Sequence, residues 1–73
     1  MKLVTVGTGS SGNCHLLKRD NDRYVALDCG CKWSDVLVGC AFRPIDIDLA
    51  LVTHSHRDHS RYVGDFKKSG IDV

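Results

Sequence analysis

Short apolar blocks separated by polar turns occupy the first half of the chain, and they predict strands. The apolar run LVTV at residues 3–6 leads into glycines, and the segments CHLLK at 14–18 and YVALDC at 24–29 flank a polar run. Within that run Asp20–Asp22 is a strong turn signal, because Asp and Asn side chains bond their own backbone and tolerate left-handed conformations. We therefore predict an antiparallel hairpin formed by residues 14–18 and 24–29.

Helical and strand periodicities alternate in the second half of the chain. The segment SDVLVGCAF, residues 34–42, has the apolar spacing of a short amphipathic helix, which Ser34 would cap and which ends near Pro44. The next segment, IDIDLALVT at 45–53, alternates and then becomes continuously apolar, as a strand entering a covered sheet does. The pattern thus predicts a helix followed by a buried strand.

A second helix and the start of another strand are predicted at the end of the chain. In SRYVGDFKKSG, residues 60–70, Tyr62, Val63 and Phe66 share one helical face. Lys67 and Lys68 fall in the last turn, where they favour the helix dipole, and Gly70 is a candidate C-cap. The final IDV would open a further strand.

Composition limits the chain to one small domain and assigns no function. Its 73 residues carry ten Lys and Arg against nine Asp and Glu, and a net charge of +1 argues neither for nor against a polyanionic partner. No apolar run approaches the roughly 20 residues that cross a bilayer, and no signal peptide is visible, so we expect a cytoplasmic protein without a membrane partner. In the absence of a visible signal peptide, the four cysteines are interpreted as reduced cytosolic thiols: Cys14, Cys29, Cys31 and Cys40. For Cys29 and Cys31 a structural role is preferred to a metal-binding one, because their C-x-C spacing is not the C-x-x-C of a zinc ribbon.

The stretch GTGSSGN matches the glycine pattern of dinucleotide-binding folds at Gly7, Gly9 and Gly12. That pattern binds a pyrophosphate only where a helix begins at the third glycine, because the free N–H groups of the helix hold the anion. The predicted hairpin stands where this helix would have to be. We predict a loop between two strands that binds no nucleotide.

Three histidines and an aspartate lie within HSHRDH, directly after the predicted buried strand. His54 and His56 are two residues apart, so in an extended segment both rings project from the same side and can bind one ion. Asp58 and His59 are adjacent, so the chain must turn there and aim them at a neighbouring point. Imidazole and carboxylate together suit zinc, with manganese or iron as alternatives. The other interpretation is a solvated polar loop ahead of a helix.

At these residues the chain resembles a known family. THSHRDH, residues 53–59, looks like the T-H-x-H-x-D-H signature of the metallo-β-lactamase superfamily, and GTGSSGN followed by ALDCG is similar to the start of its phosphodiesterase and exonuclease-like branch. The resemblance implies an α/β fold, with residues 1–73 forming the N-terminal portion of an αββα sandwich that is apparently truncated. It also implies two divalent ions, one held by His54 and His56 and the other by Asp58 and His59. Family members use such ions to hold a hydroxide that attacks the substrate, and Asp58 would orient this nucleophile.

Two departures from the family pattern bear on activity. A glycine commonly follows the last histidine by three residues, whereas this chain has Tyr62 there and reaches glycine at Gly64. The remaining metal ligands of the family come from later segments. We therefore expect the 73 residues alone to bind zinc or manganese weakly and to be inactive, so that the rest of the domain or a partner chain would complete the metal site.

Other polar residues allow two interpretations each. Asp28, at the end of a strand, is either an outer-shell acceptor for the N–H of a ligand histidine or a turn-forming aspartate. His15 is taken as an ordinary strand residue. The cations Arg57, Arg61, Lys67 and Lys68 could attract a phosphate backbone, but an Arg61–Asp65 pair on a solvated helix face explains them better.

The sequence thus favours a metal-dependent hydrolase that acts on phosphodiester bonds of nucleic acid. The preference for this substrate comes from the branch of the superfamily that the glycine-serine loop resembles, and is an analogy. A non-catalytic metal-binding or interaction module, and a hydrolase of thioesters or lactams, are the alternatives.

Overall fold

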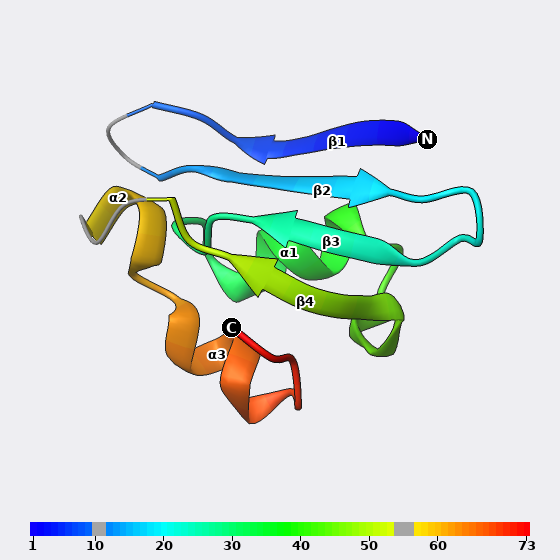
Figure 1. Cartoon of the computed structure of the whole chain (residues 1–73). Helices are drawn as coiled ribbons and strands as arrows, with labels where there is room; N and C mark the ends of the chain where they lie inside the picture. Colours follow the sequence, from blue (N-terminus) through cyan, green and yellow to red (C-terminus); the bar gives the residue numbers. More distant parts are fainter. Residues whose placement is uncertain (10–11, 54–56) are drawn as a thin grey trace.

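Four strands form one mixed sheet in the computed structural model, which describes residues 1–9, 12–53 and 57–73, with residues 57 and 58 as backbone alone (Figure 1). The strands are β1 (Lys2–Gly7), β2 (Cys14–Lys18), β3 (Tyr24–Leu27) and β4 (Ile47–Leu51), in the spatial order β1-β2-β3-β4. The first three are antiparallel, and β4 runs parallel to β3. This is the α/β architecture expected from the sequence.

The two predicted loops of the antiparallel part are confirmed. In the β2–β3 turn, the Arg19 amide donates to the Arg23 carbonyl at 2.8 Å, and Asp22 has a left-handed φ of 62°. The GTGSSGN segment joins β1 to β2, and Gly12 and Asn13 enter β2 in non-helical backbone. The glycine pattern therefore lacks the helix that dinucleotide binding needs.

Helix α1 (Trp33–Gly39) begins one residue before the predicted cap. Its N-cap is Lys32, which makes no side-chain capping bond, so the prediction of Ser34 was wrong. Trp33 belongs to the helix because its ring packs edge-on against Phe66, with centroids 5.0 Å apart. This contact joins α1 to the C-terminal part of the chain, which local sequence cannot reveal.

The helix also ends earlier than its apolar spacing predicts. Cys40 is the C-cap, and Ala41 and Phe42 adopt left-handed φ values of 55° and 60° that leave the helix. A short 3₁₀ turn, η1 (Pro44–Asp46), then leads into β4. The predicted strand therefore starts at Ile47 rather than Ile45.

The helix predicted over residues 60–70 is two helices, α2 (Arg57–Ser60) and α3 (Val63–Lys68). The backbone of Cys29 causes the interruption: its amide donates to the His59 carbonyl at 2.6 Å, and its carbonyl accepts from the Tyr62 amide at 2.8 Å. These two groups would bond within a continuous helix. The expected Arg61–Asp65 ion pair is also missing from the described residues, since the break separates the two.

Helix α3 ends as predicted. Gly70 has φ 83°, its amide donates to Lys67, and the Ile71 amide donates to Phe66 at 3.1 Å, which is a Schellman motif. Beyond it, Asp72 bridges Leu49 of β4 in parallel. The predicted opening of a further strand is therefore present as a single bridge.

One face of the sheet carries the core, to which α1 and α3 contribute Val36 and Phe66. The four cysteines are buried there as free thiols, and burial raises the pKa of Cys14 to about 12. The other face carries a row of paired apolar residues: Leu3, Leu17, Val25 and Leu49. In the described part of the chain, no helix has the length and apolar character needed to cross a bilayer.

Candidate metal centre

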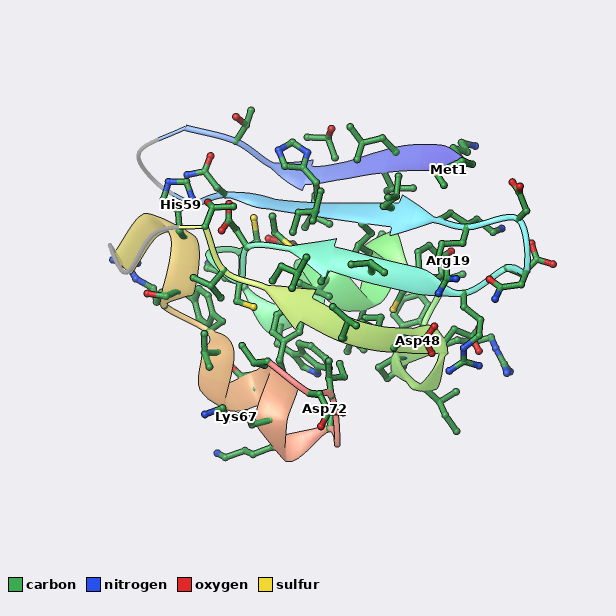
Figure 2. All side chains as sticks on the ribbon, viewed as in Figure 1. Met1, Arg19, Asp48, His59, Lys67 and Asp72 are labelled. Carbon is green, nitrogen blue, oxygen red and sulfur yellow. The ribbon has the colours of Figure 1, made fainter. Side chains whose placement is uncertain are left out.

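Three segments meet at the end of the sheet where β3 and β4 terminate (Figure 1). In the described residues they are Gly12 and Asn13 before β2, the turn that starts at Asp28 after β3, and Thr53 together with His59 after β4. Figure 2 shows His59 at this end, with Arg19 and Asp48 at the opposite one. The parallel arrangement of β3 and β4 accounts for the meeting, since both strands deliver their carboxyl ends to the same edge.

Asp28 is the centre of the hydrogen bonds at this edge. It is only 6% exposed and has a left-handed φ of 70°, which aspartate tolerates better than most residues. Its amide donates to the Leu51 carbonyl at 2.7 Å, which extends the pairing of β3 with β4. Its carboxylate accepts the Thr53 amide at 2.8 Å, the Thr53 hydroxyl at 3.0 Å, and lies 2.8 Å from Nδ1 of His59.

The charge of Asp28 decides which nitrogen of His59 carries the hydrogen. Burial opposes ionisation of the carboxyl, but the hydrogen bonds from Thr53 and His59 outweigh it and hold the pKa of Asp28 below its ordinary value. An ionised carboxylate only accepts hydrogen bonds, so Nδ1 of His59 must be the donor. In the neutral ring the lone pair is then on Nε2, the atom that can bind a metal ion.

The backbone of Cys29 holds the same histidine from a second direction. The Cys29 amide donates to the carbonyl of His59, and the Cys29 carbonyl accepts from Tyr62. His59 is thus fixed through its main chain by Cys29 and through its ring by Asp28. Two consecutive residues after β3 therefore set the position of α2.

The glycine loop packs onto the same turn. Asn13 closes the loop, because its side chain accepts from the Gly9 amide at 3.1 Å and donates to the Gly9 carbonyl at 2.7 Å. The Gly30 amide donates to the Asn13 carbonyl at 2.9 Å, and a Cβ on Gly12 would lie 2.4 Å from the Gly30 carbonyl oxygen. Glycine at position 12 is therefore required by this close approach.

Comparison with known proteins assigns the family. The family model described as the metallo-beta-lactamase superfamily matches residues 7–73. The chain belongs to this superfamily. Exodeoxyribonuclease WalJ of Streptococcus pneumoniae, in the curated sequences of strains D39 and R6, is 33% identical over 76 aligned residues, which cover 99% of this chain. The chain spans 28% of the length of these curated relatives.

The segment THSHRDH, which resembles the superfamily signature, lies only partly within the described residues. His54 and His56 fall outside them, and so does the side chain of Asp58, whose backbone belongs to α2. Among the side chains that the structure describes, no three His, Cys, Asp or Glu residues form a group that could hold a metal ion. The convergence of His54 with His56 and of Asp58 with His59 stays a prediction.

Two features of this superfamily member were not anticipated from its sequence. Thr53 is the partner of Asp28, and its only signal was its place immediately before the histidines. A cavity of about 290 Å³ adjoins the site and is lined in part by Lys32 and Tyr62. These two residues are far apart in the sequence, so no sequence pattern indicated that they line one cavity. His15 lies in β2, as expected, and its ring is 3.2 Å from the Thr5 hydroxyl of the paired strand.

Proposed function

We propose that this chain contributes part of the active site of a metal-dependent hydrolase that cuts phosphodiester bonds of nucleic acid. Membership of a superfamily of metal-dependent hydrolases supports the reaction class, and the relative named as an exodeoxyribonuclease supports the substrate. The observation that carries the proposal is the hydrogen bond between Asp28 and His59, because it presents a ring nitrogen in the form that binds a metal ion.

The residues available as ligands fit two divalent ions. His54 and His56 would hold one ion, and Asp58 and His59 the other. Two imidazoles, and an imidazole with a carboxylate, are donor sets suited to zinc, and manganese or iron also accept them. When bound, such ions lower the pKa of a water molecule toward about 7 and polarise the bond under attack.

The chain's own residues would then position the reacting groups. Asp28 keeps the hydrogen of His59 on Nδ1 and fixes the ring plane, and Thr53 keeps Asp28 ionised through two hydrogen bonds. Asp58 would orient the attacking water. In this proposal the substrate is nucleic acid, the compartment is the cytoplasm, where free thiols persist, and the rest of the domain or a partner chain supplies the remaining ligands.

Metal content and hydrolysis, measured together, test this function. Elemental analysis would be run on the 73-residue chain and on a chain extended through the remaining superfamily ligands, alongside hydrolysis of a simple phosphodiester and of a single-stranded oligonucleotide. We expect zinc or manganese and turnover in the extended chain, and weak binding with little turnover in residues 1–73. Hydrolysis of a thioester or a lactam in place of the phosphodiester would overturn the substrate class, and an inert extended chain would overturn the enzyme.

A further inference from the structure

A cavity of about 290 Å³ opens beside the candidate metal centre. Its wall comes from the end of β1, the glycine loop, the turn after β3, the start of α1 and the break between α2 and α3. The residues that matter for its chemistry are Lys32, Asp35, Arg61 and Tyr62. Its size is near the lower end of small-ligand sites, which span about 300–1,000 Å³. It can therefore hold one small unit of a ligand, and no double helix.

The backbone of Cys29 connects this cavity to the candidate metal centre. Cys29 pairs with His59 on one side and with Tyr62 on the other, and the next residue, Gly30, lines the cavity. Tyr62 also lines it and is only three residues beyond His59. A ligand in the cavity would consequently lie next to the segment that carries the metal-binding signature.

The lining combines two cations with an aromatic ring. Lys32 and Arg61 are exposed, and neither forms an ion pair with any residue whose side chain is described. Asp35 is the one carboxylate in the lining, so the two cations leave an excess of one positive charge. The half-buried Tyr62 supplies an aromatic ring.

We propose that this cavity holds one nucleotide of a single-stranded nucleic acid, next to the bond that is cut. Lys32 and Arg61 contact its phosphate, and its base stacks on Tyr62, as single strands do on aromatic side chains in proteins that bind them. The inference deepens the proposed function and rests on it for the location of the cut bond. Binding itself needs no metal, so the two can be tested apart.

The test measures binding with chelator present, which removes any contribution of metal ions and of hydrolysis. A fluorescent oligo(dT) of about eight nucleotides would be titrated by anisotropy at salt concentrations from about 50 to 200 mM. Lys32→Gln and Arg61→Gln should each reduce the slope of log affinity against log salt by about 0.7, the value for one lost contact to a single strand. Tyr62→Leu should weaken binding about tenfold and leave that slope unchanged.

Lys68→Gln is the matched control, because Lys68 is an exposed cation in the last turn of α3 that does not line the cavity. It should leave both affinity and slope as they are. When oligo(dT) is added to the unmodified chain, the amide chemical shifts of Gly12, Gly30 and Tyr62 should change. Amide spectra of the variants recorded without oligo(dT) should match that of the unmodified chain elsewhere, which shows that the variants are folded. Equal slopes for Lys32→Gln, Arg61→Gln and Lys68→Gln would overturn the proposal. If the variants bind oligo(dT) as expected but the extended chain cuts no nucleic acid, the nucleotide site in the cavity is supported and the proposed hydrolase function is rejected.

Discussion

Nδ1 of His59 lies 2.8 Å from a carboxylate oxygen of Asp28, across 31 positions of sequence. The same carboxylate accepts two hydrogen bonds from Thr53, so one buried aspartate joins the end of β3 to Thr53 and to His59, on either side of the candidate metal ligands His54 and His56. A buried, ionised group of this kind is costly when its partners are removed. It therefore couples the stability of the fold to the geometry of the site.

Replacing that carboxylate should affect folding and metal affinity together. We expect Asp28→Asn to lower the free energy of unfolding by about 1.5–3 kcal/mol, because hydrogen bonds to a charged group are lost. Metal affinity should fall about 10- to 100-fold, as for other partners of ligand histidines. Urea unfolding and metal titration measure the two effects. Asp22→Asn is the control, since Asp22 is exposed and its left-handed φ of 62° suits asparagine. Similar losses in both variants would contradict the role of Asp28.

Two glycines allow a matched test of the packing between the glycine loop and the turn after β3. A methyl group on Gly12 would lie 2.4 Å from the Gly30 carbonyl oxygen, so Gly12→Ala should destabilise the fold by about 1–3 kcal/mol. A methyl group on Gly64, in α3, meets nothing within 4 Å. Gly64→Ala should therefore raise the free energy of unfolding by about 0.5–1 kcal/mol. Thermal unfolding of the two variants measures both signs. A stable Gly12→Ala variant would show that the loop is not held against Gly30.

Stability should decline in alkaline solution because of Cys14. Burial, with smaller contributions from neighbouring acidic groups, raises the pKa of this thiol from 9.0 to about 12. Above pH 9 the unfolded chain loses the proton while the folded chain keeps it, so unfolding becomes more favourable as pH rises, at up to about 1.4 kcal/mol per pH unit. Below pH 9 this contribution to stability is complete. Urea unfolding between pH 7 and 11 should show a shallower decline for Cys14→Ala than for the unmodified chain. Parallel curves would refute the assignment.

Removal of a signature residue should abolish turnover in the extended hydrolase. For His56→Ala and Asp58→Ala we expect kcat to fall to background, since the activated water is the nucleophile and its loss is not a matter of substrate binding. His15→Ala is the matched histidine control, because His15 contacts Thr5 of the paired strand, and it should retain kcat. Steady-state kinetics with a phosphodiester substrate separates kcat from KM. A rate that survives Asp58→Ala would eliminate the mechanism.

A prediction from sequence succeeds here where a few adjacent residues determine the structure. The Asp20–Asp22 turn and the Gly70 cap are local devices, and both are present. The glycine pattern was correctly predicted to be a loop between strands for the same reason, because the hairpin that follows leaves no room for the helix of a dinucleotide-binding fold. The α/β class was implied by the resemblance to the metallo-β-lactamase superfamily, and the mixed sheet with its helices confirms it.

The errors come from contacts between distant parts of the chain. Helix α1 starts at Trp33 because of Phe66, and the C-terminal helix breaks because Cys29 takes the hydrogen bonds of His59 and Tyr62. No property of residues 60–70 alone signals that interruption. The partnership of Asp28 with Thr53 escaped prediction for the same reason, since it depends on the parallel pairing of β3 with β4.

The change from antiparallel to parallel pairing within the sheet sets an order of folding. Strands β1 to β3 are joined by short loops, whereas β4 reaches β3 only through the crossover of residues 28–46. Closing the longer loop costs more chain entropy, so we expect the hairpins to form first and the β3–β4 pair to form late. Asp28 meets Thr53 and His59 only once that pair exists. A newly synthesised chain would therefore complete its hairpins while Thr53 and His59 are still unattached, and the contacts around Asp28 would form after the antiparallel part of the sheet.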